Sequence, residues 1–157
     1  MDAADRLGVY TDIEDVPECY RLHRYEAEYA GRDVWKEFCE TAEYGEEPSA
    51  HFLRAVDRSG NHWRDHMRAR RRHHALATPT DVETWCQSLL SEKSTATAYN
   101  YWVRIRRFYE WLQWHVDHPH CYDPVLMAVV SGGAAGEIWE EKLRKWRNAR
   151  ARYDNNE

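Results

Sequence analysis

Apolar residues recur at three- and four-residue spacing along most of this chain, and no segment shows the strict alternation of a half-buried β-strand. The clearest stripe lies between residues 95 and 117, where Ala98, Trp102, Ile105 and Leu112 share one helical face. This periodicity excludes sheet-based folds. We therefore expect an all-α fold, a bundle of five or more helices.

Gly, Pro and Ser/Thr residues divide the helical pattern into segments. We expect breaks at residues 45–48, at Ser59-Gly60-Asn61 and at residues 118–120. The expected helices cover residues 18–30, 32–44, 49–56, 62–77, about 78–91, 95–117, 124–130 and 137–153.

Two sites offer helix N-caps. Either Thr78 caps a helix with Pro79 in the first position, or Thr80 does so with Glu83 completing a capping box. Ser94 or Thr95 caps the next helix. The residues expected in the core from these two helices are Val82, Trp85, Cys86, Leu89, Ala98, Trp102, Ile105, Phe108 or Tyr109, Leu112 and Val116.

A chain of 157 residues is the size of one domain. We divide it into an acidic, flexible lead (residues 1–16), a helical domain (17–130), and a glycine-rich hinge with a C-terminal helix (131–157). The last helix could be a connector to a further domain or a docking helix for a neighbouring subunit.

No apolar run approaches the roughly 18 residues of a membrane-spanning helix, and the acidic first residues do not resemble a secretory signal. The four cysteines form no Cys-x-x-Cys pair, which is typical of reduced thiols. We expect a cytoplasmic protein without contact to membranes and without a cofactor.

Charge is distributed unevenly along the chain, although the net charge is −5. Residues 1–50 carry 5 Lys+Arg and 14 Asp+Glu, whereas residues 51–110 carry 11 and 6. Of the 22 cationic residues, 18 are Arg, which favours forked contacts to phosphate. The basic middle segment is therefore the candidate for binding nucleic acid.

The candidate DNA contacts form two groups. Adjacent cations at 68–74 could bind phosphates without regard to sequence, and polar and cationic residues at helical spacing after residue 93 could enter a groove together. Trp111 and Trp114 share the latter side, which we expect to be exposed. The candidates are Arg68, Arg70, Arg71, Arg72, His73, Lys93, Ser94, Thr97, Asn100, Arg104 and Arg107.

The segments ALATPTDVETWCQSLL, STATAYNYWVRIRRFYEWL and YDPVLMAVV, between Ala75 and Val130, resemble the core-binding domain of tyrosine recombinases of the phage-integrase family, particularly the haloarchaeal type. The resemblance implies a small SAM-like helical bundle that binds one face of a double-stranded DNA recombination site. It covers about a third of the chain closely.

The resemblance does not imply catalysis by this chain. His51-Phe52-Leu53-Arg54 matches the family's H-x-L-R box, and Thr95 to Tyr99 loosely resembles the nucleophile segment, but both lie in the wrong order relative to the core-binding motifs. We therefore expect a DNA-binding protein that is not an enzyme.

Other interpretations stay open. His115, His118, His120 and Cys121 could bind zinc, although their spacing fits no known finger, and His62 and His66 stand four residues apart. The chain could instead be a helical protein-interaction module that regulates a recombinase or replication protein. Its acidic N-terminal region could pair with the 68–74 cluster, even as an inhibitor, and its C-terminal helix could contact DNA, a recombinase catalytic domain or a second copy.

Overall fold

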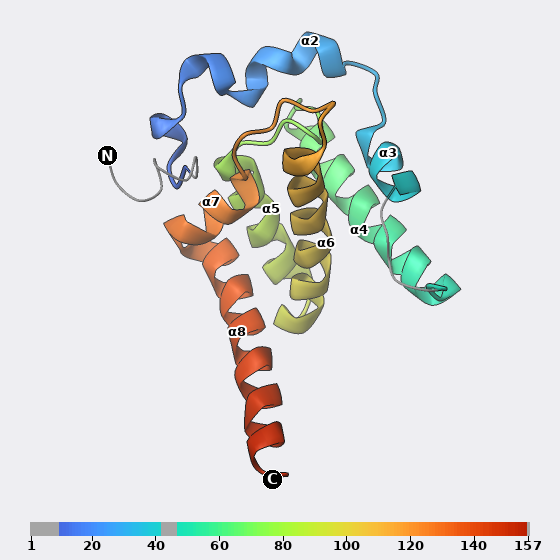
Figure 1. Ribbon diagram of the computed structural model, residues 1–157, viewed down its shortest axis with the longest axis vertical. Coiled ribbons are helices and arrows are strands. Elements are labelled where there is room, and N and C mark those ends of the chain that lie inside the picture. The colour runs from blue at the N-terminus through green and yellow to red at the C-terminus, as the bar shows by residue number, and fades with distance from the viewer. Residues whose placement is uncertain (1–9, 42–46, 157) are drawn as a thin grey trace.

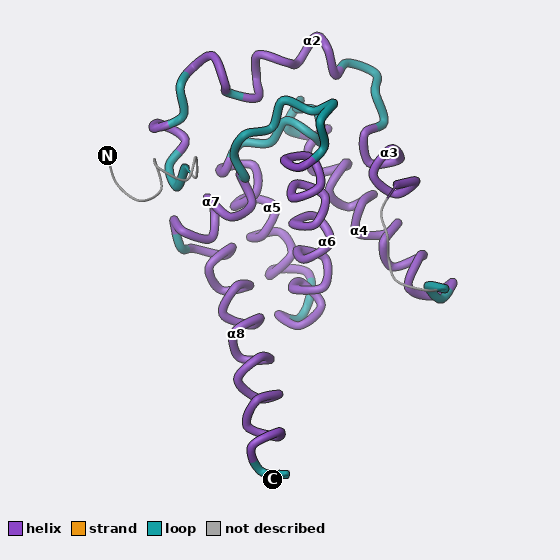
Figure 2. Tube along the Cα trace, viewed as in Figure 1, coloured by secondary structure: helices purple, strands orange, loops and turns teal. Residues whose placement is uncertain are grey.

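The computed structural model describes residues 10–41 and 47–156 of the chain. All secondary structure in these residues is helical, which confirms the all-α prediction (Figures 1 and 2). The three 3-10 helices are η1 (Ile13–Asp15), η2 (Glu18–Tyr20) and η3 (Leu22–Tyr25). The α-helices are α2 (Glu26–Tyr29), α3 (Val34–Thr41), α4 (Ala50–Ala69), α5 (Pro79–Glu92), α6 (Thr95–Trp114), α7 (Pro124–Ser131) and α8 (Gly133–Asp154).

Helix α6 is the centre of the bundle and contacts α3, α4, α5, α7 and α8. Its predicted apolar stripe is buried as expected, and both Phe108 and Tyr109 belong to it. The four core residues predicted for α5 are also buried. Val116 is the exception, because α6 ends at Trp114 and leaves this side chain 96% exposed.

Helix α4 runs without a break through the predicted interruption at Ser59-Gly60-Asn61. Gly60 is buried, and a Cβ atom added to it would lie 2.2 Å from Cε2 of Trp35. The glycine therefore makes room for the indole of α3 and does not end the helix. The prediction of two separate helices, at 49–56 and 62–77, is therefore wrong.

The capping pattern of α5 decides where α8 begins. Thr78 caps α5 in a capping box with Asp81, which is the first of the two predicted alternatives. Glu83 is consequently available to α8, where its carboxylate accepts hydrogen bonds from the N–H groups of Ala134 (2.7 Å) and Ala135 (3.0 Å). Helix α8 thus begins at Gly133, four residues earlier than predicted.

The segment before α3 forms 3-10 turns and the short helix α2, where the sequence predicted one helix over 18–30. It lies over the end of the bundle formed by the loops 70–78 and 115–123 (Figure 1). The Leu22 N–H donates to the hydroxyl of Tyr122 (2.8 Å), and the Tyr29 hydroxyl bonds Nδ1 of His118 (2.5 Å). Val16 is buried, while residues 1–9 of the predicted lead lie outside the described residues.

No helix within the described ranges 10–41 and 47–156 is long and apolar enough to cross a membrane.

Candidate nucleic-acid interface

Helix α4 ends in a turn that places arginine where glycine is usual. The Arg71 N–H bonds the Arg68 carbonyl (3.0 Å), and the Arg72 N–H bonds the Met67 carbonyl (3.0 Å), as in a Schellman motif. Arg71 therefore has a φ of 58°, in the left-handed region that costs a non-glycine residue roughly 1–2 kcal/mol. Its guanidinium makes no ion pair or hydrogen bond with any residue that the structure describes. Strained backbone positions cluster at ligand-binding and active sites, so Arg71 is a candidate for binding a ligand.

Two hollows flank this turn and share Arg71, Arg72 and His73. The larger, which we call the arginine hollow, has a volume of about 440 Å³; its lining residues are Gly31, Arg32, Asp33, Arg64, Arg68, Arg71, Arg72, His73 and His74. The smaller has a volume of about 250 Å³ and is lined by His23, Glu26, Arg70, Arg71, Arg72, His73 and Leu76. The arginine hollow has five guanidinium groups and one carboxylate in its lining, and four of the five arginines pair with a carboxylate, Arg32 with that of Glu37 (2.8 Å).

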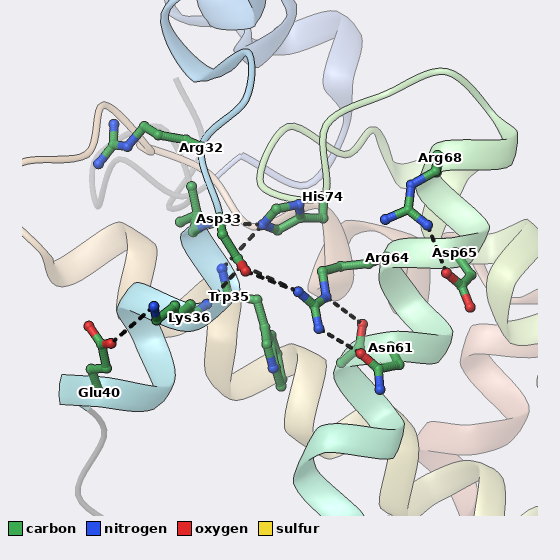
Figure 3. A network of polar contacts seen from close by, with 12 residues as sticks. Arg32, Asp33, Trp35, Lys36, Glu40, Asn61, Arg64, Asp65, Arg68 and His74 are labelled. Carbon is green, nitrogen blue, oxygen red and sulfur yellow. Dashed lines mark hydrogen bonds and ion pairs between the residues drawn. The ribbon is translucent and has the colours of Figure 1, made fainter.

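Ion pairs already present in the arginine hollow neutralise part of this charge (Figure 3). Arg64 bonds the carboxylate of Asp33 (3.3 Å), and Arg68 bonds that of Asp65, three residues earlier on α4 (3.0 Å). Both pairs are solvent-accessible, and such pairs contribute at most about 1 kcal/mol. A phosphate could therefore replace either carboxylate at little cost.

Arg70 and Arg72, predicted as phosphate anchors, are also structural. Their Nε atoms bond the two carboxylate oxygens of Asp81 (2.6 and 3.1 Å), which is fully buried at the start of α5. This arrangement ties the end of α4 to the α5 capping box. The acidic N-terminal region does not make these pairs. Of the acids in the described part of that region, Asp33 pairs with an α4 arginine, and Glu26 lines the smaller hollow.

His73 and His74 add no positive charge, contrary to their prediction as members of a cationic cluster. Burial lowers the pKa of His73, and it lowers the pKa of His74 to about 3, so both rings are neutral near pH 7. Nε2 of His73 donates to the Arg32 carbonyl (2.8 Å). Nε2 of His74 accepts from the N–H groups of Val34 and Trp35 (both 3.1 Å), and thereby caps α3 (Figure 3).

Four members of the second group of candidates, Lys93, Ser94, Thr97 and Asn100, lie at the other end of α5. Ser94 caps α6 and accepts from the Thr97 N–H (3.2 Å), while Lys93 lies over the Tyr101 ring (4.7 Å). Thr97 and Asn100 are exposed. The 14 residues of α5 separate this group from the arginine turn by about 20 Å, at 1.5 Å per residue. The structure therefore does not bring the two groups together.

Arg104 is not on an exposed face, contrary to the prediction. Its guanidinium donates to the Ser59 hydroxyl (3.0 Å) and lies over the Phe52 ring, because α4 packs along this side of α6. Trp111 is likewise partly buried against Phe38, whereas Arg107 and Trp114 are exposed. Packing by α4 thus divides the predicted stripe into separate exposed residues.

The histidines form a hydrogen-bonded aromatic cluster. His120 donates through Nε2 to the Ala75 carbonyl (2.6 Å), His118 bonds Tyr29, and the rings of His115 and His118 lie 5.2 Å apart. Within the described ranges, no group of three or more His, Cys, Asp or Glu side chains is arranged to hold a metal ion.

His62 and His66 point to different partners. Nδ1 of His62 accepts from the indole of Trp85 (2.8 Å), and Nε2 of His66 bonds the Asp81 carbonyl (3.0 Å). The pair four residues apart thus joins α4 to α5, and the zinc interpretation has no support here.

The residues that resembled a catalytic box are dispersed. His51 and Arg54 are exposed in the first turns of α4, and the Tyr99 ring on α6 lies under Nζ of Lys145 (4.7 Å). Tyr99 therefore packs against α8, which lies outside the segments that resemble the family's catalytic motifs.

The sequence reasoning missed Arg64 and Arg32, which line the arginine hollow. Arg64 had a detectable signal, because it precedes Arg68 by four residues and therefore lies on the same face of α4. Arg32 had none, since it reaches this surface only through the packing of α3.

Comparison of the chain with protein-family models, with curated proteins and with solved structures finds no match.

Proposed function

We propose that this chain binds the phosphate backbone of double-stranded DNA through the arginine hollow, and that it does so without catalysing a reaction. The observation that carries the proposal is the convergence of Arg64, Arg68, Arg71 and Arg72 on one hollow, where the guanidinium of the strained Arg71 has no partner among the described residues. The resemblance to the core-binding domain of tyrosine recombinases supports the same function and adds recombination-site DNA as the partner.

The chemistry of the hollow suits phosphate better than it suits a carboxylate partner. Arginine presents a planar fork that matches two phosphate oxygens, and Arg72 binds Asp81 through Nε, which leaves its Nη atoms available to a ligand. The lining includes no large apolar side chain that would anchor a protein segment. We therefore expect weak, salt-sensitive binding that is nearly independent of base sequence.

The second group of candidates determines how long a duplex the proposed interface would contact. A duplex that also contacts Lys93 and Asn100 has to run along α5 for about 20 Å, which corresponds to roughly six base pairs at 3.4 Å per base pair. Arg107 lies further along α6, which returns toward the start of α5, as the bond between the Tyr109 hydroxyl and the Ala77 N–H shows. The proposal includes Arg107 as a separate backbone contact and assigns no such contact to Arg104, which is bound to α4.

A cytoplasmic location belongs to the same proposal. DNA is the partner, and the four cysteines are free thiols, as in a reducing compartment.

The test is binding of a fluorescent random-sequence duplex, followed by anisotropy across a salt series. For the parent, log affinity should fall linearly with log salt, with a slope of about −0.9 per neutralised phosphate. Arg71→Gly should weaken binding and reduce the slope by about one unit. The same substitution should raise the free energy of unfolding by about 1 kcal/mol, because glycine adopts positive φ without strain.

Arg58→Ala is the matched control, since Arg58 is exposed on the same helix and outside both hollows. It should leave affinity and slope almost unchanged. Equal losses from Arg58→Ala and Arg71→Gly would show that net charge alone attracts DNA. An unshifted anisotropy at low salt would refute DNA binding and favour the protein-interaction module.

A further inference from the structure

The last turns of α8 project beyond the bundle as a cationic helix. Residues 144–154, which we call the cationic tail, are all exposed and extend past the other helices (Figure 1). At 1.5 Å per residue this segment is about 16 Å long. No acidic residue occurs between positions 142 and 153, and the cations of the tail are Arg144, Lys145, Arg147, Arg150 and Arg152.

Most of this charge is not neutralised within the chain. Two cations at the start of the tail contact the bundle, since Arg144 pairs with Glu141 and Nζ of Lys145 lies over the Tyr99 ring (4.7 Å). Like charges on neighbouring turns of a helix repel one another, so an anionic partner would stabilise this segment. The cations that make no ion pair or hydrogen bond with any residue that the structure describes are Arg147, Arg150 and Arg152.

The cations lie on two opposite edges of the helix. Lys145 and Arg152 share one edge, because seven positions are close to two full turns at 3.6 residues per turn. By the same geometry, Arg147 and Arg150 share the edge on the other side. The tail therefore presents positive charge on both of its sides at once.

The face between these edges bears small side chains. Asn148 and Ala151 lie on it, and side chains of this size allow a helix to approach base edges closely. In a major groove, Asn can pair with adenine and the methyl group of Ala can contact that of thymine. Trp146 and Tyr153, which are 65% and 69% exposed, lie on the opposite face and would point away from the bases.

We propose that the cationic tail lies in the major groove of double-stranded DNA as a second contact, an inference that rests on the proposed function because both contacts use DNA. The major groove is about 12 Å wide and admits an α-helix. A phosphate backbone borders the groove on each side, so both cationic edges of the tail meet phosphates together.

The distribution of charge favours DNA over two other anionic partners. An acidic protein surface would contact one edge of the tail and leave the other in solvent. A helix bound to an anionic membrane needs a broad apolar face opposite its cations, and Trp146 and Tyr153 alone do not provide one.

The cationic tail and the arginine hollow are separate contacts. The arginine turn lies at the opposite end of the bundle from the tail (Figure 1). Substitutions in one therefore leave the other intact, and their effects on log affinity should add when both contact DNA.

Binding of the fluorescent random-sequence duplex across a salt series tests the proposal with two double variants of the full chain. Lys145→Gln/Arg152→Gln removes the charge of one edge, and Arg147→Gln/Arg150→Gln removes that of the other. Each should weaken binding and make the salt slope shallower by about two units, one for each lost phosphate contact.

Arg54→Gln/Arg58→Gln is the matched control. It removes the same charge from two exposed positions of α4 that lie outside both hollows at the arginine turn, so it should leave the slope almost unchanged. Tail variants that lose no more affinity than this control overturn the proposal. A loss confined to one edge overturns the placement of the tail within a groove.

Comparison with Arg71→Gly separates this proposal from the proposed function. A loss in Arg71→Gly without a loss in the tail variants overturns the tail contact and leaves the arginine hollow as the binding site. The reverse result refutes binding by the hollow and supports the tail. A parent that does not bind duplex DNA at low salt overturns both.

Hydrogen exchange of the parent locates the contact without any substitution. Amides of residues 147–153 lie in an exposed helical end that packs against no other element, so they should exchange rapidly in the free chain. Saturating duplex should slow their exchange severalfold. Unchanged exchange in this segment would overturn the tail contact.

Discussion

Stability should fall steeply as pH drops from 7 to 5, and His74 should account for a large share of the loss. Its Nε2 accepts two hydrogen bonds at the N-terminus of α3, which only the neutral ring can do. Protonation would turn this acceptor into a donor that faces two other donors and the positive end of the helix dipole. Burial is the main reason that the pKa of His74 falls to about 3, and the charges of His73, Arg64 and Arg68 lower it further.

The magnitude follows from linkage. Because the folded-state pKa of about 3 lies below the unfolded value of 6.5, the unfolded chain binds more protons at acidic pH. The contribution of His74 to stability is therefore complete above pH 6.5 and declines as pH falls from there toward 3. Each pH unit below 6.5 lowers the free energy of unfolding by about 1.4 kcal/mol, so the change from pH 7 to pH 5 lowers it by about 2 kcal/mol.

His120 should act in the same direction. Burial lowers its pKa to about 4, so it adds about another 2 kcal/mol to the loss between pH 7 and 5. Asp123 opposes both histidines. Its burial raises the pKa of the carboxyl to about 6, and its contribution to stability is lost as pH rises through 6. Asp123 returns about 1.4 kcal/mol between pH 6 and 5, so the net loss should be about 3 kcal/mol, a large part of the 5–15 kcal/mol typical of domains.

The assay is urea denaturation followed by tryptophan fluorescence at half-unit pH intervals. His74→Gln replaces the imidazole by an amide whose oxygen accepts hydrogen bonds but does not titrate, so the variant should lose about 2 kcal/mol less than the parent between pH 7 and 5. His51→Gln, at an exposed position on α4, should show the parent's slope. A slope in His74→Gln equal to that of the parent would refute the reasoning. So would an imidazole NMR titration of the parent in which the folded-state His74 protonates near pH 6.

Three further substitutions test contacts between helices. Gly60→Ala should lower the free energy of unfolding by about 1–3 kcal/mol in urea denaturation, although alanine favours helix, because the added methyl group would overlap Trp35. A stabilised variant would contradict this packing. Asp81→Ala should lower the free energy of unfolding by about 2–4 kcal/mol in the same measurement, because a helix cap and a charged hydrogen bond are lost together. A loss under 1 kcal/mol would mean that water replaces both interactions. Glu83→Gln should raise amide hydrogen exchange at Ala134 severalfold, and unchanged protection would show that the start of α8 does not depend on this carboxylate.

Local sequence was sufficient for the elements whose signals lie within one helical turn. The caps at Ser94 and Thr78 were each one of two alternatives that the sequence offered, and the start of α7 at Pro124 was predicted. Each of these signals is a contact between residues two or three positions apart. The apolar stripes of α5 and α6 likewise identified the core. The same periodicity identified the all-α class, because 3.6-residue and two-residue repeats are incompatible.

Tertiary structure decided every case in which a residue had two possible partners. Gly60 carried the local signal of a break, but burying Trp35 against α4 outweighs the weak helix propensity of one glycine. Glu83 could have capped its own helix, and it caps α8 because Asp81 already occupies the nearer position. In both cases the partner lies far away in the sequence, on α3 for Gly60 and on α8 for Glu83.

The candidate interface likewise combines features that the sequence predicted with features that only the tertiary structure decided. The run of arginines at 68–72 indicated a cationic surface, and the structure places it around one hollow. Which of these arginines is available was not predictable, because Arg70 and Arg72 are drawn to a buried carboxylate eleven and nine residues away, and burial makes His73 neutral. The helical pattern places Arg104 on an exposed face, whereas packing against α4 partly buries it in the bundle. Helical periodicity specifies which residues share a face, but which faces meet depends on the packing of all the helices at once.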